Sequence, residues 1–442
     1  MMKSLASYLM LIVVAWAATG PGVLSAQSLN VRNLEVIDLQ MVPAKGLVWE
    51  GQSTQDTNWN KITETPDGRI WFSGGDHWGA DGIYWEHGQS GPWDVEDRYE
   101  RLWGFGNATL NYYDPATDQT GVALELNRAS ALYSNAETPG HGKIHSNIAS
   151  DSDGNLFFAG YMGHSYTHEY TAAYYPKSYP GGALLKYDPE EDHVEYLGIP
   201  TPYGATVALY YDEERNILNG LSVDRQRFWR VDLTTMELFH YESRSGGREM
   251  IMDRNGYCYF LNPFGGLTRF NPDTEEFEDI DVELPGGNFR ATVVSSENVI
   301  YGVSRDGFVW SFDPETEQIQ DYGHIIGRPE VSQYTPNIAL DEELDRLYFI
   351  AGNHERGMEG TLGTLTILDL ESEEFYWAGK IRGVEGCFGA LVASDHTVYF
   401  NSYGTHYVNG KEQTLDSGES VRRPYLVRYD PPKNLESLRN DP

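Results

Sequence analysis

Cysteine is nearly absent from this 442-residue chain, in which only Cys258 and Cys387 occur. They lie in different parts of the sequence, and nothing brings them together or gives them the spacing of zinc ligands. We therefore predict that neither a disulfide nor a cysteine-bound metal holds the fold. Both cysteines are expected to be buried small residues, as free cysteines usually are.

Basic residues are also scarce, since 32 Lys and Arg stand against 66 Asp and Glu and give a formal net charge of −34. Nucleic acid and anionic membranes need a basic surface, so neither is an expected partner. Many acids fall in turn segments such as DPEEDH and read as solvated surface, and none has the spacing of a calcium-binding loop. No metal site is predicted and no cofactor is required, although a structural metal ion would be compatible with the sequence.

Only one long apolar run is present, from Leu9 to Ala18 after Lys3. With the small residues that precede Gln27, it predicts a secretory signal peptide over residues 1–26. Position 27 is Gln where a lipoprotein would need Cys, and no second run of about 18 apolar residues follows. We expect a protein exported to the periplasm or the medium, without membrane insertion and monomeric.

What the sequence has in abundance is a repeat. Seven copies pair one strand-forming segment with a second that ends in Asp-Pro, Asn-Pro or Asp-Leu; examples are DSDGNLFFAG…ALLKYDPEED and SENVIYGVSR…FVWSFDPETE. Short runs of aromatic and β-branched residues at roughly 40-to-60-residue spacing are typical of four-stranded propeller blades. The sequence therefore predicts an all-β protein, a seven-bladed β-propeller forming one domain over residues 27–442.

The last copy lacks a fourth strand, because after Tyr429 only the segment DPPKNLESLRNDP remains. The N-terminal segment from Leu34 to Gln40 reads as a strand and could complete that blade. Such a closure would remove an open sheet edge. We predict a ring closed by the N-terminal strand.

In a propeller, the loops that join the second strand to the third open on the face where each blade's inner strand begins. Here these loops are long in four copies, over 75–107, 161–182, 353–363 and 403–424. Eight of the twelve histidines fall on that predicted face: His77, His87, His141, His145, His164, His168, His354 and His406. Cations collect there too: Lys143, Arg225, Arg227, Arg290, Arg356, Arg422 and Arg423. This face is therefore basic and rich in histidine on an otherwise acidic protein, and it carries aromatics such as Tyr161 and Tyr203. These residues predict an anionic ligand with flat faces on which an aromatic ring can stack. A sugar that carries carboxylate or sulfate groups fits this description best.

The most specific segment is HGKIHS, from His141 to Ser146, which leads into the second blade. His145 should face the channel mouth, and His164 should overhang it from the end of the next strand. Two histidines with a tyrosine and an arginine suit β-elimination from a uronic acid. Arg or protonated His neutralises the carboxylate, a base of suitable pKa removes the C5 proton, and an acid protonates the departing O4. Hydrolysis would need a carboxylate pair, which the sequence does not place, and it stays open.

The segments HGKIHS, NLFFAGY…GHSY, GGALLKYDPEEDHVEYLGIP and NGLSVDRQRFWRVDLTT resemble the propeller ulvan lyases of polysaccharide lyase families 24 and 25. The resemblance is specific over residues 139–235 and extends over most of the chain as architecture. It implies a secreted enzyme of a marine bacterium that cleaves ulvan, a sulfated algal polysaccharide, at its uronic acid and leaves an unsaturated uronate.

By motif, the resemblance implies His145 and His164 as catalytic histidines, Arg225 as the arginine with Arg227 as its substitute, and Tyr210 as the tyrosine. Tyr210 matches by spacing but falls toward the far end of its strand, whereas Tyr203 and Tyr161 lie nearer the mouth. Lys143, His141, Arg227, Arg290, Arg356 and Tyr203 are the predicted substrate-binding residues. Some family members hold a zinc through Cys and His, which the lone Cys258 here does not support.

Two alternatives stay open. One is a lyase that acts on another polyuronide or its oligomers. In that case the long insertion over 75–107 would determine which substrate the enzyme binds. The other is a non-catalytic propeller that binds an anionic glycan, a role that the fold also serves. Only a lyase would generate absorbance near 235 nm, from the new double bond conjugated to the carboxylate.

Overall fold

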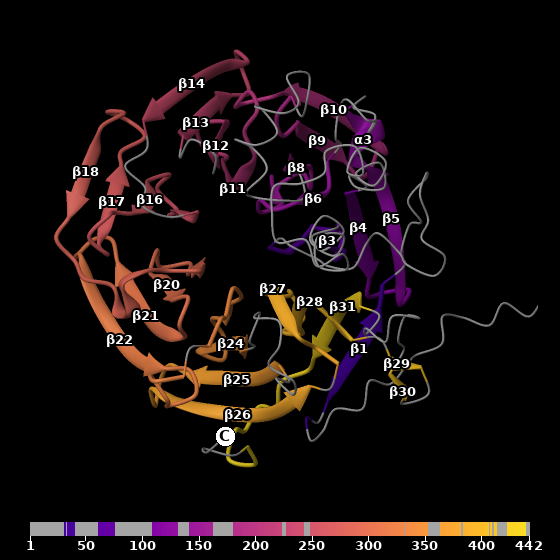
Figure 1. Ribbon diagram of the computed structural model, residues 1–442, viewed down its shortest axis with the longest axis vertical. Coiled ribbons are helices and arrows are strands. Elements are labelled where there is room, and N and C mark those ends of the chain that lie inside the picture. Colours follow the sequence, from indigo (N-terminus) through magenta and orange to yellow (C-terminus); the bar gives the residue numbers. More distant parts are fainter. Residues whose placement is uncertain are drawn as a thin grey trace, which may run out of the picture.

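The computed structural model describes residues 31, 33–39, 61–75, 108–130, 141–161, 180–222, 227–242, 248–331, 333–351, 363–381, 383–405, 407–408, 411–412 and 422–438. Seven antiparallel sheets are arranged in a ring around a central axis (Figure 1). The predicted seven-bladed β-propeller is confirmed. The predicted signal peptide, residues 1–26, lies outside the described residues.

The first three blades follow the chain from the inside outward. Blade 1 contains β2 (Thr63–Glu64), β3 (Ile70–Gly74), β4 (Thr109–Asp114) and β5 (Gln119–Glu125), and a short helix α3 (Leu126–Ala129) follows it. Blade 2 contains β6 (Lys143–Ile144), β7 (Ala149–Ser150), β8 (Leu156–Tyr161), β9 (Leu184–Asp188) and β10 (His193–Gly198). Its inner strand is divided, since β6 and β7 both pair with β8. Blade 3 contains β11 (Thr206–Asp212), β12 (Ile217–Ser222), β13 (Arg227–Asp232) and β14 (Glu237–Glu242).

The next three blades repeat this order. Blade 4 contains β15 (Met250–Met252), β16 (Cys258–Leu261), β17 (Leu267–Phe270) and β18 (Phe277–Ile280). A single 3-10 turn, η2 (Pro285–Gly287), leads to blade 5, which contains β19 (Ala291–Val294), β20 (Ile300–Val303), β21 (Phe308–Asp313) and β22 (Gln318–His324). Blade 6 contains β23 (Ala339–Asp341), β24 (Arg346–Ala351), β25 (Gly363–Asp369) and β26 (Glu374–Ile381).

The seventh blade joins the two ends of the chain. It contains β27 (Gly386–Val392), β28 (Val398–Thr405), β31 (Arg422–Tyr429) and, on the outside, β1 (Leu34–Asp38); a small hairpin of β29 (Tyr407–Val408) and β30 (Lys411–Glu412) lies between β28 and β31. β1 pairs antiparallel with β31, with Val36 opposite Val427. The predicted ring closure by the N-terminal strand is therefore confirmed.

The Asp-Pro and Asp-Leu signals mark the hairpins between the third and fourth strands. In six blades an Asp or Asn side chain accepts a backbone N–H two or three residues later; for example, Asp313 Oδ1 accepts from Glu315 at 2.9 Å. This side-chain hydrogen bond builds the turn locally. The residue at the end of each of these turns has a positive φ: Asp118, Asp192, Met236, Glu275, Glu317 and Glu373. Local chemistry thus fixes each hairpin, which is why the repeat is legible in the sequence.

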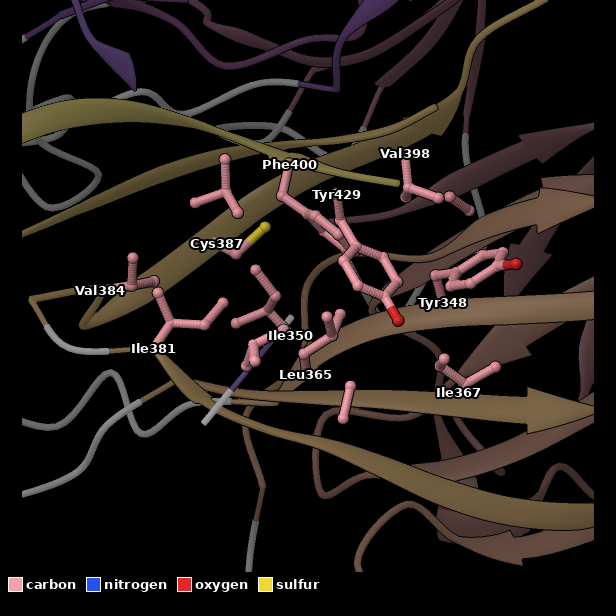
Figure 2. Close-up of a cluster of buried hydrophobic side chains, with 14 of the residues drawn as sticks. Tyr348, Ile350, Leu365, Ile367, Ile381, Val384, Cys387, Val398, Phe400 and Tyr429 are labelled. Atoms are coloured by element: carbon pink, nitrogen blue, oxygen red, sulfur yellow. The ribbon is translucent and has the colours of Figure 1, made fainter. Parts of the chain in front are cut away.

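The core lies between neighbouring blades, where the second and third strands are buried on both faces. Each of the six residues of β8 and of β24 is buried, whereas none of the residues of the outer strand β10 is. Figure 2 shows the cluster between blades 6 and 7, in which Tyr348, Ile350 and Leu365 face Phe400 and Tyr429, with Cys387 among them. Cys258 and Cys387 are both free and buried, as predicted. Full burial of one such side chain contributes about 1.5–3 kcal/mol.

The inner strands β2, β6, β11, β15, β19, β23 and β27 lie nearest the centre of the ring, and β5, β10, β14, β18, β22 and β26 lie on its perimeter (Figure 1). We call the face on which the inner strands begin the mouth. The loops between second and third strands lie on the mouth as well, because the second strand runs back toward it. No helix among the described residues is long and apolar enough to cross a membrane.

Candidate functional site

The candidate site begins where the chain enters blade 2. Lys143 in β6 pairs with Tyr161, the last residue of β8. The Lys143 ammonium lies 4.7 Å from the centroid of the Tyr161 ring, and the ring of His145 lies 5.3 Å from it. Lys143 and Tyr161 are 2% and 1% exposed, while His145 retains partial exposure. The segment HGKIHS therefore places an ammonium and an imidazole against one tyrosine.

Two arginines complete this group from other blades. Arg248, just before β15 in blade 4, donates from Nη2 to the Tyr161 hydroxyl at 3.1 Å. Arg290, just before β19 in blade 5, forms an ion pair with Glu249 and donates from Nε to the Tyr334 hydroxyl at 2.7 Å. The charges of Lys143, Arg248 and Arg290 all act on His145. We call His145, Tyr161, Lys143, Arg248 and Arg290 the mouth cluster.

The electrostatics of the mouth cluster fix the protonation of His145. Burial, followed by the positive charges of Lys143, Arg248 and Arg290, holds the pKa of His145 well below its ordinary value. The imidazole is therefore neutral near pH 7 and can accept a proton. An anion bound among these cations would offset their field and raise that pKa. The arrangement therefore suits a neutral base beside an anionic ligand.

His141 lies elsewhere. It is fully buried, and its ring packs against Gly160, where an added Cβ would lie 2.4 Å from Nδ1. Burial lowers the pKa of His141 to about 3. The histidine therefore stays neutral in the interior between blades 1 and 2 and is not part of the mouth cluster.

Tyr210, the predicted catalytic tyrosine, lies within the central channel. Its hydroxyl donates to the backbone oxygen of Met250 at 2.9 Å and accepts from Lys61 Nζ at 3.1 Å. The ammonium also donates to the backbone oxygen of Thr292 at 3.3 Å, so it links blades 3 and 5. Tyr210, Lys61 and Thr292 line a cavity of about 620 Å³ whose lining does not include His145. The structure thus brings Tyr161, rather than Tyr210, to His145.

The other predicted residues fall into two groups. Tyr203, in the connection that leads to β11, is 46% exposed and has a positive φ of 61°. Arg227 begins β13 opposite Glu242, and its charge acts on His240 of the outer strand β14. Neither acts on His145 in the way that Lys143 and Arg290 do. His164, Arg225 and Arg356 lie outside the described residues.

Sequence reasoning missed Arg248, although a signal for it exists. Arg248 and Arg290 both stand just before the inner strand of their blade, and that position in the repeat faces the mouth. The same repeat position that predicted Arg290 therefore also points to Arg248. Among the described residues no group of three His, Cys, Asp or Glu side chains is placed to hold a metal ion.

Comparisons with known proteins define the fold class. No family model and no curated protein matches the chain. Among solved structures, it is similar to the extracellular domain of BT4673 from B. thetaiotaomicron, with 12% identity, a TM-score of 0.54 and coverage of 92% of this chain and 44% of that one. It is also similar to U3-55K (11% identity, TM-score 0.53, coverage 90% and 98%) and to the WD40 repeats of RRP9 (11%, 0.53, 93% and 99%).

At such low identity these similarities establish the β-propeller class alone. The chain also spans less than half of the BT4673 chain. The fold class does not specify an activity, so the evidence for one lies in the mouth cluster.

Proposed function

We propose that this protein is a secreted polysaccharide lyase that cleaves ulvan by β-elimination at the uronic acid. The observation that carries the proposal is the mouth cluster, in which three cations surround one neutral histidine on a chain of net charge −34. In so acidic a protein, cations gathered at one place are suited to hold an anion. The sequence resemblance to propeller ulvan lyases over residues 139–235 supports the choice of substrate.

The proposed reaction assigns a role to each member of the cluster. Lys143, Arg248 and Arg290 bind the uronate carboxylate and stabilise the charge that develops on it. His145 takes the C5 proton, the electron pair forms the C4–C5 double bond, and the C4–O4 bond breaks. The Tyr161 hydroxyl donates the proton that O4 receives. Arg248 at the same hydroxyl then stabilises the negative charge left on the tyrosine oxygen.

One observation favours a second candidate, a propeller that binds an anionic glycan without cleaving it. Tyr210, which the family resemblance implies as the catalytic tyrosine, donates to the backbone oxygen of Met250 and meets Lys61 in the channel rather than His145. Without a tyrosine in that role, the cations could serve for binding alone. A lyase for another polyuronide would use the same mouth chemistry with other loops.

The first test is a continuous assay at 235 nm on ulvan, with pectate, alginate and a glucuronan in parallel. We expect absorbance to rise on ulvan alone. A rise on another polyuronide would keep the reaction and change the substrate. If the folded protein produces no rise on any of them but binds ulvan, the binding candidate replaces the lyase.

Single substitutions then test the roles. His145→Ala should reduce kcat about 10²- to 10⁴-fold, the usual contribution of a positioned acid or base, with an unchanged circular dichroism spectrum. Tyr161→Phe should have a loss of the same order, whereas Tyr210→Phe should have little effect on kcat. His193→Ala, at an exposed position of β10, is the matched control. Full activity of His145→Ala would rule out its role as base, and the opposite ranking of the tyrosines would restore Tyr210.

A further inference from the structure

Blades 4 and 5 differ from blades 1 and 2 on the mouth. The turns between their second and third strands are short, comprising residues 262–266 and 304–307. The corresponding connections in blades 1 and 2 run over 75–108 and 162–183. A polymer that extends beyond the mouth cluster therefore meets compact turns on this side of the ring.

The turn of blade 4 presents an aromatic side chain to solvent. Phe264 is 94% exposed, and no other exposed large apolar side chain among the described residues exceeds 49%. Its backbone is fixed, since Asn262 Oδ1 accepts the N–H groups of Phe264 and Gly266 at 2.9 Å each and Gly265 adopts a φ of 85°. Because burying apolar surface is favourable, a ligand that covered this ring would gain binding free energy.

Hydrogen bonds link the turn that carries Phe264 to the connection between blades 4 and 5, which leads to the mouth cluster. The Gly265 carbonyl accepts the N–H of Leu284 at 3.4 Å, in the connection that contains η2. In the same connection Asn288 accepts the N–H of Arg305 at 2.6 Å through Oδ1. The turns of blades 4 and 5 are thereby joined through one connection, which continues directly to Arg290.

Arg305 adds a charge to these linked turns. The side chain is exposed, and its guanidinium carbon lies 5.9 Å from the centroid of the Tyr334 ring. The Arg290 guanidinium lies 5.4 Å from the same ring, so one tyrosine connects the two arginines. Arg290 forms an ion pair with Glu249, whereas no carboxylate of the described part of the chain forms an ion pair with Arg305. Arg305 is therefore a charge that an anionic ligand can reach.

We propose that Phe264, Arg305 and Tyr334, here called the blade 4–5 rim, form a subsite for sugar residues beyond the one held in the mouth cluster. The proposal rests on the proposed function and names the ligand as an anionic polysaccharide, not a short sugar. Phe264 stacks on the apolar face of one pyranose ring, and Arg305 binds a sulfate or carboxylate of another. Asp281 and Glu283 are exposed and lie between the outer strand β18 and η2. Because these carboxylates would repel an anionic polysaccharide, we expect the polysaccharide to pass on the side of the rim that faces the central axis.

The test measures binding of two probes by the full chain. Native electrophoresis at 4 °C in gels that contain ulvan reports the affinity for polymer, with dextran gels as the neutral reference. Calorimetry with an unsaturated ulvan disaccharide reports the mouth cluster alone. Arg305→Gln and Phe264→Ala are the variants. Lys380→Gln and Phe239→Ala, both at exposed positions of outer strands, are the matched controls.

We expect each rim variant to weaken polymer binding about tenfold, as one charged hydrogen bond or one buried ring would, and to leave disaccharide binding unchanged. Arg305→Gln should also reduce the salt dependence of polymer binding, whereas Phe264→Ala should not. Polymer binding equal to that of the controls, or equal loss for polymer and disaccharide, would overturn the proposal.

The outcomes separate the rim from the reaction. Rim variants that weaken polymer binding, in a protein that generates no 235 nm absorbance, would support the subsite and refute the lyase. Cleavage of ulvan that depends on His145 but not on the rim would refute the subsite and keep the lyase. Absence of any ulvan binding by the wild type would overturn both.

Discussion

At the scale of single residues, His145 stands in a field that opposes its protonation. Burial and the charges of Lys143, Arg248 and Arg290 hold its pKa well below the ordinary value of histidine. A cation cluster of this kind costs free energy, because like charges repel. Under the proposed function, binding of an anionic substrate offsets that cost.

This arrangement predicts that ligand binding and proton uptake are linked. In the free protein, NMR of isotope-labelled histidine should show His145 neutral from pH 6 to 8. Saturation with an ulvan oligosaccharide should move its titration midpoint upward, because the anion offsets the three cations. Affinity should then increase as the pH falls through that new midpoint, since the protonated imidazole adds a positive charge.

His145→Gln assigns the His145 resonance, because it removes that signal from the spectrum. A His145 midpoint that does not move when ligand binds would contradict the linkage.

Tyr161 and Tyr210 show which features of single residues could not be predicted from the sequence. Tyr210 lies on the inner strand β11 and Tyr161 at the end of the second strand β8. The contacts of Tyr161 with His145 and Arg248 place it, rather than Tyr210, in the mouth cluster.

At the scale of elements, the ring depends on one pairing between the two ends of the chain. β1 and β31 pair over Leu34–Asp38 and Tyr425–Tyr429, and Val36 packs in the cluster between blades 6 and 7. Without β1, β31 would become an open edge with unpaired N–H and C=O groups. The closure of the propeller is therefore made by strand pairing, with no disulfide between the described cysteines.

Deleting residues 27–39 from the exported protein should lower the melting temperature and cause concentration-dependent self-association. The loss of buried Val36 and Leu39 alone should cost on the order of 3 kcal/mol. Scanning calorimetry and light scattering measure the two effects. A matched deletion of residues 439–442 should leave both unchanged. A monomeric deletion variant that melts like the wild type would show that β1 is dispensable.

The strand elements were predictable because their signals are local. An Asp or Asn that accepts backbone N–H groups builds each outer hairpin from residues only two or three positions away, as Asp313 does with Glu315. Runs of aromatic and β-branched residues then form the strands between these turns, and the second strands β8 and β24 are buried at every position. The division of the inner strand of blade 2 into β6 and β7 carries no such local signal, and it emerges only from the pairing of both segments with β8.

At the scale of the whole molecule, the net charge of −34 dominates. Repulsion among 66 acidic residues destabilises the compact state, and dissolved salt screens it. Salt should have the opposite effect on ligand binding at the mouth cluster, because screening weakens the attraction of its cations for an anionic ligand. Stability and ligand binding should therefore respond to ionic strength in opposite directions.

Raising NaCl from 0.05 to 1 M should increase the melting temperature by about 1 °C for each kcal/mol of repulsion that is screened, because an unfolding entropy of about 2.1 cal/mol/K per residue sums to roughly 0.9 kcal/mol/K over a chain of this length. Over the same range, affinity for ulvan should fall. Differential scanning fluorimetry and gel retardation measure the two, and KCl should act like NaCl because screening depends on ionic strength. A melting temperature that falls with salt would contradict the repulsion argument.

The amino-acid sequence was enough to predict the number of blades, their order and the hairpin turns, because side-chain hydrogen bonds within a few residues and short runs of aromatic and β-branched residues specify each of them. The closing strand was predicted from the missing fourth strand of the last repeat rather than from a local pattern. Lys143, His145 and Arg290 were also predicted on the mouth, since position in the repeat fixes the face. Which side chains meet depends on the tertiary structure. Arg248 reaches Tyr161 across 87 residues, and Lys61 reaches Tyr210 across 149, so the curvature of the ring rather than any local pattern sets these contacts.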